Sequence, residues 1–328
     1  MDFQYEDWET RYRGIRSNDE KGEIYRLNFS LGVGIYAGVP RGHRFSIVFK
    51  TKEKSLHLPQ SEFLKVDYAQ NKDGEFLTTL ETKADEYSDV LYIFAIDLVR
   101  YVENVDIESA AVKRIQARYS QWKGLFSSSH EKMPIETQRG LLGELLFLKD
   151  YMFTNFTYEE AIAAWSGAKK TSKDFAFSKY WYEVKTAKST ASEITISSVA
   201  QLSGPLPGQL VVYRLDEIAP TYENPKAATI LEVARAIYKQ ISSDMDVVRE
   251  FFERLSMLKF PLQLLLTDSK DAENRFEKFI VEGPNFYNVG DDFPRITDTA
   301  CFDGAVSSVR YTLLLNMLSK FEVKEMLK

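Results

Sequence analysis

The sequence predicts a mixed α/β protein in which a β-rich N-terminal domain is followed by a domain of strands and helices. Short runs that alternate apolar and polar residues fill the first 104 residues or so, the pattern of half-buried strands. Leucines recur at three- and four-residue intervals within 134–151, which indicates a helix. Further strand-like runs between turn residues occupy 174–215. We expect domains at 1–125 and 126–328.

In the N-terminal domain the strands are expected at 23–29, 45–49, 63–68, 76–80 and 90–94. Lys72-Asp73-Gly74 is the composition of a hairpin turn. Gly32, Gly34 and Gly38 are interpreted as turn or bulge positions, because no lysine-serine or lysine-threonine signature of a phosphate-binding loop follows. A closing helix should follow with Asp106 as its N-cap. Recognition, oligomerisation or a purely structural role are all open to this domain.

The second domain should begin after the polar stretch 127–132, which resembles a linker. The buried face of its first helix consists of four leucines, Leu141, Leu142, Leu145 and Leu148. Glu144 lies inside this stripe. An acid near an apolar face is costly unless a charge or a metal partners it, so its position calls for a partner. The alternative is that Glu144 lies at the border of the stripe and is solvated.

An acidic hairpin is predicted next. Asp174 precedes a short strand at 175–177, Ser178-Lys179 forms a turn, and an aromatic strand at 180–182 continues into Glu183-Val184-Lys185. Because side chains alternate along a strand, Glu183 and Lys185 should project to one side while Val184 packs on the other. If the strands pair, Asp174 and Glu183 converge at one end of the hairpin.

Two carboxylates and the main-chain carbonyl of Val184 would make an oxygen-only site that suits Mg²⁺, with Mn²⁺ as a substitute. Such an ion activates water and stabilises charge on a phosphoryl group. Lys185 would then orient the attacking water or neutralise the phosphate. The alternative is that Asp174 is a loop residue and that Glu183 and Lys185 form an exposed ion pair.

The remaining elements follow from the same patterns. Strands are expected at 193–198, 209–215, 262–266, 279–282 and 308–315, and helices at 230–241 and 245–258. Ser242-Ser243-Asp244 separates the two helices as a break and cap signal.

These residues carry a resemblance. Glu144, Asp174 and Glu183-x-Lys185 resemble the PD-(D/E)XK nuclease superfamily. A longer string resembles bacterial PD-(D/E)XK motif proteins associated with DNA methyltransferases and with restriction and phage-defence loci: Trp165-x-Gly167, Asp174-Phe175, Glu183-Val184-Lys185-Thr186 and Gln201-Leu202, with a second patch at Phe293-Pro294-Arg295 and 306–316. The resemblance implies a restriction-endonuclease-like core, a central mixed sheet flanked by helices.

Site roles follow from the resemblance by position. It implies Asp174 and Glu183 as metal ligands, Lys185 as the catalytic lysine, and Glu144 as the helix acid that completes or tunes the metal site. Gln201 corresponds to a glutamine that supports the lysine or the DNA backbone, although a structural amide explains it equally well.

The charge distribution bears on DNA binding. The net charge of −6 is unfavourable for a protein whose whole surface grips a polyanion. Residues 161–190, however, hold six lysines against two acids, a local balance of +4. The DNA-binding candidates on this basic rim are Lys169, Lys170, Lys173 and Lys188. A solvated lysine-rich loop is the alternative. Lys173 also departs from the motif, whose name expects proline there.

Several classes of protein are disfavoured. A single cysteine, Cys301, excludes an intrachain disulfide and a cysteine-rich zinc site. The three histidines lack metal-ligand spacing. No apolar run is long enough to span a bilayer, and the acidic N-terminus lacks the order of a signal peptide. We expect a cytoplasmic protein without membrane contact.

The leading hypothesis is a magnesium-dependent DNA endonuclease acting in restriction or phage defence. The alternative is a catalytically silent or partner-activated DNA-binding or assembly subunit of a defence complex, because a nuclease fold can persist as a binding module. Glycoside hydrolysis by two carboxylates is disfavoured by the adjacent lysines. Partners are DNA, with a homodimer as the simplest arrangement for double-strand cuts, and a methyltransferase or other defence subunit.

Overall fold

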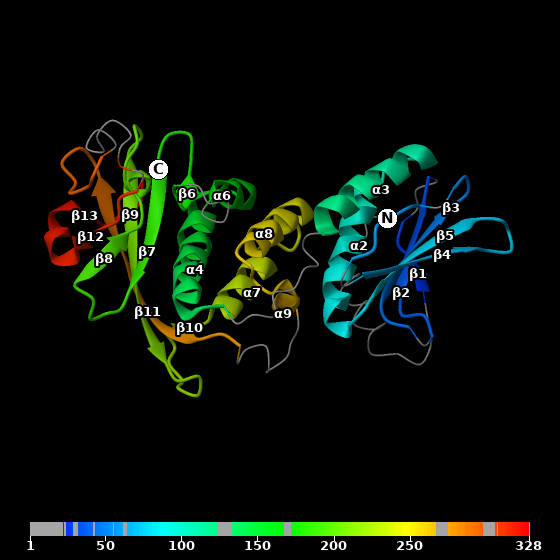
Figure 1. Cartoon of the computed structure of the whole chain (residues 1–328), viewed down its shortest axis with the longest axis horizontal. Coiled ribbons are helices and arrows are strands. Elements are labelled where there is room, and N and C mark those ends of the chain that lie inside the picture. The colour runs from blue at the N-terminus through cyan, green and yellow to red at the C-terminus, as the bar shows by residue number, and fades with distance from the viewer. Residues whose placement is uncertain are drawn as a thin grey trace. The chain divides into compact units, whose positions relative to one another are not determined.

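The chain forms two compact units in the computed structural model (Figure 1). The structure describes residues 22, 24–28, 32–41, 43–54, 56–61, 64–123, 133–166, 172–266, 275–297, 306 and 308–327. The first unit combines Met1–His130 with Ser242–Asp268, and the second combines Glu131–Ile241 with Ser269–Lys328. The expected boundary at 125/126 assigns Ser242–Asp268 to the second domain, whereas this segment clusters with the first unit. The expected linker at 127–132 lies outside the described residues.

The first unit is built on an antiparallel sheet. Its strands are, in spatial order, β1 (Ile24–Arg26), β2 (Gly34–Gly38), β3 (Ser46–Thr51), β5 (Phe76–Thr82) and β4 (Leu64–Gln70). The predicted hairpin turn between β4 and β5 is confirmed. Gly74 adopts φ +81°, where a side chain would be strained, and Asn71 Oδ1 accepts the amide hydrogens of Asp73 and Glu75.

Two N-terminal predictions are wrong. The run expected as a strand at 90–94 lies in helix α2 (Ser88–Val102). Gly34 and Gly38, interpreted as turn or bulge positions, begin and end strand β2, which pairs with β3 in a regular register. The helix expected after Asp106 is α3 (Glu108–Lys123), and its buried face contains the predicted Val112, Ile115, Tyr119 and Trp122. Its first helical hydrogen bonds run to the carbonyl of Ile107, so Asp106 lies just before the cap.

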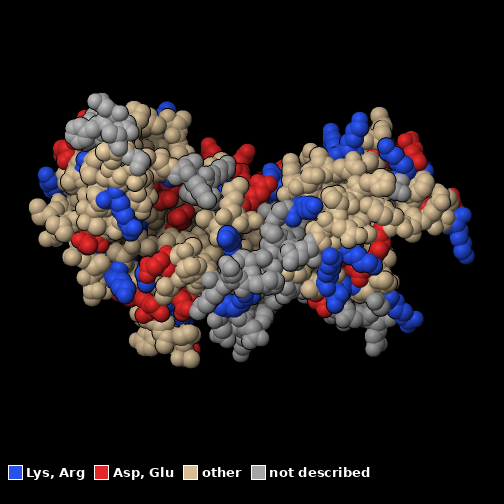
Figure 2. Space-filling model, viewed as in Figure 1, with Lys and Arg blue, Asp and Glu red and all other residues tan. Residues whose placement is uncertain are grey.

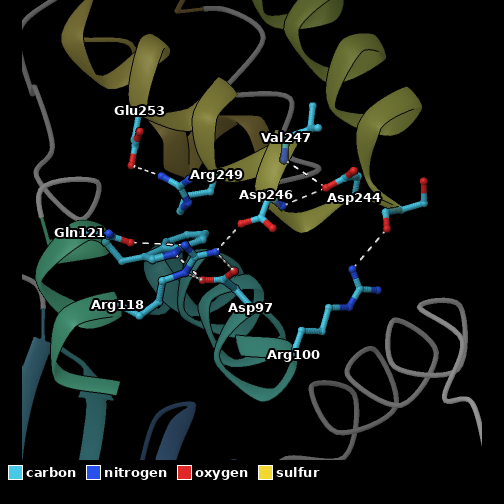
Figure 3. A network of polar contacts seen from close by, with 11 residues as sticks. Asp97, Arg100, Arg118, Gln121, Asp244, Asp246, Val247, Arg249 and Glu253 are labelled. Carbon is cyan, nitrogen blue, oxygen red and sulfur yellow. Dashed lines mark hydrogen bonds and ion pairs between the residues drawn. The ribbon is translucent and has the colours of Figure 1, made fainter. Parts of the chain in front are cut away.

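The segment Ser242–Asp268 adds two helices to the first unit, α8 (Met245–Met257) and α9 (Leu262–Leu266). The strand expected at 262–266 is therefore wrong. Asp244 caps α8 as predicted, because its Oδ1 accepts the amide hydrogens of Asp246 and Val247. Arg118 of α3 joins Asp97 of α2 to Asp246 of α8, a contact network shown in Figure 3. Distant parts of the sequence thus share one packed unit.

The second unit contains a mixed sheet. Its strands are β10 (Ala227–Ala228), β11 (Lys278–Val289), β9 (Gly208–Ile218), β7 (Trp181–Ala187) and β6 (Phe175–Ala176), with β13 (Glu322–Val323) paired to β11. β7 and β9 run parallel and the other pairs are antiparallel. β8 (Glu193–Ile196) and β12 (Tyr311–Leu314) form a separate two-stranded sheet. The strands expected at 193–198, 209–215, 279–282 and 308–315 are confirmed with adjusted ends.

Helices cover one face of the mixed sheet. The predicted leucine-striped helix is α4 (Ile135–Phe147), which continues into a π-helical turn at Leu148–Met152. α4 packs on β7 at Gly143, where a Cβ atom would lie only 2.5 Å from Thr186 Cγ2. α7 (Ile230–Ile241) packs beside α4. The opposite face buries a hydrophobic core that includes side chains of β7, β9, β8 and β12. Glu144 directly follows Gly143 in α4.

The shorter elements complete the fold. They are α5 (Phe153–Asn155), α6 (Tyr158–Ala164) and the 3₁₀ turns at Asp85–Tyr87, Val199–Gln201, Leu315–Met317 and Ser319–Phe321. No helix within the described ranges is both long and apolar enough to cross a bilayer.

Candidate active site

The acidic hairpin forms as predicted, and it leaves part of one strand edge open. β6 has two residues, which pair with Tyr182 and Trp181 of β7. Beyond that pairing, Asp174 Oδ2 accepts the amide hydrogen of Val184 at 2.8 Å. The N–H and C=O of one strand residue point to the same edge, so the Val184 carbonyl faces the Asp174 side as well. Asp174 thus converges with β7 at the point where Glu183 begins the triplet.

Glu183 and Lys185 share one side of β7, as strand alternation requires. Lys185 Nζ donates to Glu183 Oε1 at 2.7 Å, and the Lys185 side chain is 16% exposed. Glu183 is 0% exposed, which rules out the exposed ion pair considered from the sequence. Its second oxygen, Oε2, is buried and has no hydrogen-bond partner in the described part of the chain. An unpaired buried carboxylate oxygen is costly, so its place in the fold calls for a cation.

Glu144 belongs to helix α4, on the face of the sheet that the helices cover. Its Oε2 accepts a hydrogen bond from Trp165 Nε1 at 2.7 Å, and Trp165 forms a β-bridge with Phe175 of the hairpin. Glu144 is therefore close enough to act electrostatically on Asp174 and Glu183. Within the described ranges no three acidic, histidine or cysteine side chains are gathered tightly enough to hold one metal ion. The structure thus supports Glu144 as a neighbour of the acidic pair and leaves its role as a ligand a proposal.

Burial and mutual repulsion favour the neutral forms of the three carboxyl groups in the site. Burial, followed by the charge of Asp174, raises the pKa of Glu183 to about 8, and Lys185 only partly opposes this. Burial likewise raises the pKa of Asp174, and it raises the pKa of Glu144 well above the usual range. Figure 2 shows acidic side chains recessed within the second unit. A divalent cation would compensate the three carboxyl groups.

The residues present fit a hard cation. Asp174, Glu183 and the Val184 carbonyl offer oxygen donors alone, the set that Mg²⁺ prefers. Because Mg²⁺ keeps several waters, two carboxylates and one carbonyl are sufficient protein ligands. Glu183 Oε2, buried and without a partner within the ranges that the structure describes, supports this fit most directly.

The predicted DNA-binding lysines lie in different environments. Lys188 is exposed after β7 and is available to a ligand. Lys173 is only 9% exposed, and its ammonium donates to the main-chain carbonyls of Ala200, Gln201 and Ser203. In this arrangement Lys173 does not form part of a basic rim, which departs from the expectation. Lys169 and Lys170 lie outside the described residues.

Gln201 is held by local contacts. Its side-chain Oε1 accepts the amide hydrogen of Ser197 at 2.7 Å, a contact that defines the turn after β8. Its main-chain carbonyl binds Lys173, not Lys185. The structure therefore favours the structural amide among the two interpretations made from the sequence.

The sequence does not predict the contacts that three residues around the site make in the structure. Trp165 belongs to the motif string, but its bond to Glu144 was not predicted. Ser166 donates through Oγ to the Lys173 carbonyl and through its amide to the Asp174 carbonyl. Lys173 was assigned to DNA contact. The adjacency of these residues to the motif was the only available sequence signal.

Fold and site together define an α/β protein with a paired-carboxylate and lysine hairpin, a class of site suited to a divalent cation and an anionic ester. More particularly, the chain belongs to the family DUF4420, described as "Putative PD-(D/E)XK family member", whose model matches residues 8–316. PD-(D/E)XK nucleases typically use a divalent metal. Comparisons with curated proteins and with solved structures found no match.

The raised pKa of Glu183 predicts that the metal-free protein loses stability at alkaline pH. A carboxyl group whose folded pKa exceeds its unfolded pKa contributes stability below the unfolded value of 4.5, and this contribution disappears as the pH rises through about 8. Between pH 6 and pH 9 the loss should be about 3 kcal/mol, because only the roughly two pH units from 6 to the folded pKa of about 8 contribute, at 1.36 kcal/mol per unit. The opening free energy of the β7 amides measures it, from hydrogen exchange in EDTA at both pH values corrected for the intrinsic exchange rate. Glu183→Gln should flatten the pH dependence, whereas an equal slope in this variant would contradict the assignment.

Proposed function

We propose that this protein is a magnesium-dependent endonuclease that hydrolyses phosphodiester bonds of DNA. The observation that carries the proposal is the buried Glu183 Oε2, which has no hydrogen-bond partner among the described residues and lies on a strand that also presents Lys185 and receives Asp174. Family membership supports a nuclease-like function in general terms. DNA as the substrate is our extension.

Each residue has a distinct part in this mechanism. Asp174, Glu183 and the Val184 carbonyl would hold the cation. When bound, Mg²⁺ lowers the pKa of the attacking water and neutralises charge on the phosphate. Lys185 Nζ, fixed by Glu183 at 2.7 Å, orients that water or the phosphate oxygen. Water oxygen forms a bond to phosphorus, one phosphorus–sugar oxygen bond breaks, and the leaving oxygen takes up a proton.

The biological setting we propose is restriction or phage defence, in which the protein acts on foreign DNA. The resemblance of the motif string to proteins at such loci supports it. A methyltransferase or another defence subunit would then be a partner. Lys188, exposed after β7, is a candidate for contact with the DNA backbone.

Plasmid cleavage tests the proposal. Asp174→Ala removes a cation ligand and should lower magnesium- or manganese-dependent cleavage at least about 10³-fold, because each 1.36 kcal/mol of lost transition-state stabilisation costs tenfold. Fold and DNA affinity should persist. The control is Glu217→Ala, an exposed acid on β9, which should cut at the wild-type rate. An EDTA sample should show no cleavage.

The products and the controls separate the alternatives. A linear product would support two sites acting together, as in a homodimer, whereas a nicked product would indicate a single site. Cleavage by Asp174→Ala equal to that of the wild type would refute the assigned site. Plasmid that stays intact with wild-type protein, yet is bound equally with and without metal, would favour the binding or partner-activated subunit.

A further inference from the structure

The buried ammonium of Lys173 lies beside the proposed cation site without belonging to it. Its Nζ donates to three main-chain carbonyls, those of Ala200 at 2.6 Å, Gln201 at 2.7 Å and Ser203 at 2.9 Å. It also lies 3.6 Å from the centre of the Trp181 ring. An ammonium group has three N–H donors, so these carbonyls use all of them. A contact with a DNA phosphate would require breaking at least one of these bonds.

The turn that Lys173 binds connects β8 to β9. Val199–Gln201 forms a 3₁₀ turn, and the carbonyl of Leu202 within the same stretch accepts a hydrogen bond from Arg295 Nη1 at 2.7 Å. The charged side chains of Lys173 and Arg295 therefore bind four successive carbonyls, those of residues 200–203. Charge-assisted bonds of this kind are shorter and stronger than neutral ones.

The main chain at Lys173 is held as firmly as its side chain. Ser166 Oγ donates to the Lys173 carbonyl at 2.9 Å, and the Ser166 amide donates to the Asp174 carbonyl at 2.7 Å. The peptide units on both sides of the Asp174 Cα atom are thereby fixed. From this position Asp174 Oδ2 reaches the Val184 amide.

We propose that Lys173 is a positioning residue for the cation site: by binding the 200–203 turn it fixes the start of the hairpin, so that Asp174 stays aligned with Glu183 and the Val184 carbonyl. This inference rests on the proposed function of the site. It also accounts for a lysine where the motif's name has proline, since proline has no side-chain donor for this turn.

Metal binding, measured without any cleavage, tests the proposal. Titration calorimetry with Mn²⁺ alone should show that Lys173→Met binds about 10–100-fold more weakly than the wild type, the usual effect of removing a residue that orients ligands. Lys173→Arg, which retains charge and donors, should recover most of the affinity. Lys179→Met, at an exposed lysine in the hairpin turn, should match the wild type.

A second variant separates positioning from general stability. Arg295→Met removes the guanidinium group that binds the Leu202 carbonyl of the same turn, and it leaves Lys173 and Asp174 unchanged. It should lower the melting temperature while Mn²⁺ affinity stays within about threefold of the wild type, a change under 1 kcal/mol. Circular dichroism checks that each variant is folded. If Lys173→Met does not fold, Ser166→Ala, which frees the Lys173 carbonyl, should still weaken Mn²⁺ binding.

The outcomes distinguish this proposal from the function on which it rests. If the wild-type protein binds no Mn²⁺, the cation site itself is wrong. If the wild type binds Mn²⁺ and Lys173→Met binds it equally well, the positioning role is overturned and the site stands. Unchanged Mn²⁺ affinity with weakened DNA binding would instead restore Lys173 as a DNA contact.

Discussion

Lys185→Met is expected to slow cleavage by about 10²–10³-fold, the usual effect of removing one group that stabilises transition-state charge. Methionine keeps most of the side-chain length on β7 and removes the charge together with the hydrogen bond to Glu183. The expectation rests on Lys185 Nζ lying 2.7 Å from Glu183 Oε1 in a site where burial strengthens electrostatic interactions. Single-turnover rates with saturating Mn²⁺ and excess enzyme would measure the chemical step.

Loss of Lys185 should also affect cation binding indirectly, and the measurement must separate the two effects. Lys185 lowers the pKa of Glu183, so its removal leaves Glu183 protonated to a higher pH and weakens metal binding near neutrality. Raising the pH and the Mn²⁺ concentration should restore binding but not the rate. Lys179→Met, at the exposed turn, is the charge-matched control. A rate for Lys185→Met equal to that of the control would refute the role of Lys185.

The hairpin could be predicted because local patterns determine it. Alternation along 181–185 decides which side chains share a face, and the turn residues decide where the strands end. Helix α4 could be predicted equally well from its leucine stripe, since one face of that helix packs on β7. The acidic pair and the lysine follow directly from these two elements.

Helix α2 could not be predicted because most of it is buried on all sides and its sequence therefore lacks an amphipathic pattern. Seven successive residues, Val90–Ile96, are all buried, since α2 contacts the sheet as well as α3, α8 and α9. A helix that is apolar all round loses the 3.6-residue period, and a short apolar run then looks like a buried strand. The membership of Ser242–Asp268 in the first unit could not be predicted for a different reason, because it depends on contacts between residues far apart in the sequence.

The hydrogen bonds of the Lys173 ammonium could not be predicted either, because they join residues far apart in the sequence. Its three acceptors lie 27 to 30 residues further along the chain, in a turn that the sequence marks only by Gln201-Leu202. Local charge counting therefore placed Lys173 on a basic rim. Only the folded arrangement shows that its charge is used within the protein.

The largest effect on stability is expected from Arg118→Met in the first unit. Arg118 donates to both oxygens of Asp97, through Nε at 2.6 Å and Nη2 at 2.5 Å, and to Asp246 Oδ1 at 2.8 Å (Figure 3). Arg118 and Asp97 are only 6% and 2% exposed. Removing one partner of a buried pair leaves an uncompensated charge, which costs roughly 3–5 kcal/mol. Hydrogen exchange of α2, α3 and α8 should therefore accelerate, with the β7 amides of the second unit as an internal reference.

Two further variants distinguish a buried charge from a general packing defect. Asp246 is 80% exposed, so Asp246→Asn should cost no more than about 1 kcal/mol. Asp97→Asn combined with Arg118→Met removes the unpaired buried charge of Asp97. The asparagine still offers an oxygen to Trp122 Nε1, which donates to Asp97 at 2.7 Å in the wild type. The double variant should therefore be more stable than Arg118→Met alone. Equal stability of the two would show that Arg118 acts through packing against α8 and the Tyr101 ring, and that the charge of Asp97 is solvated in the variant.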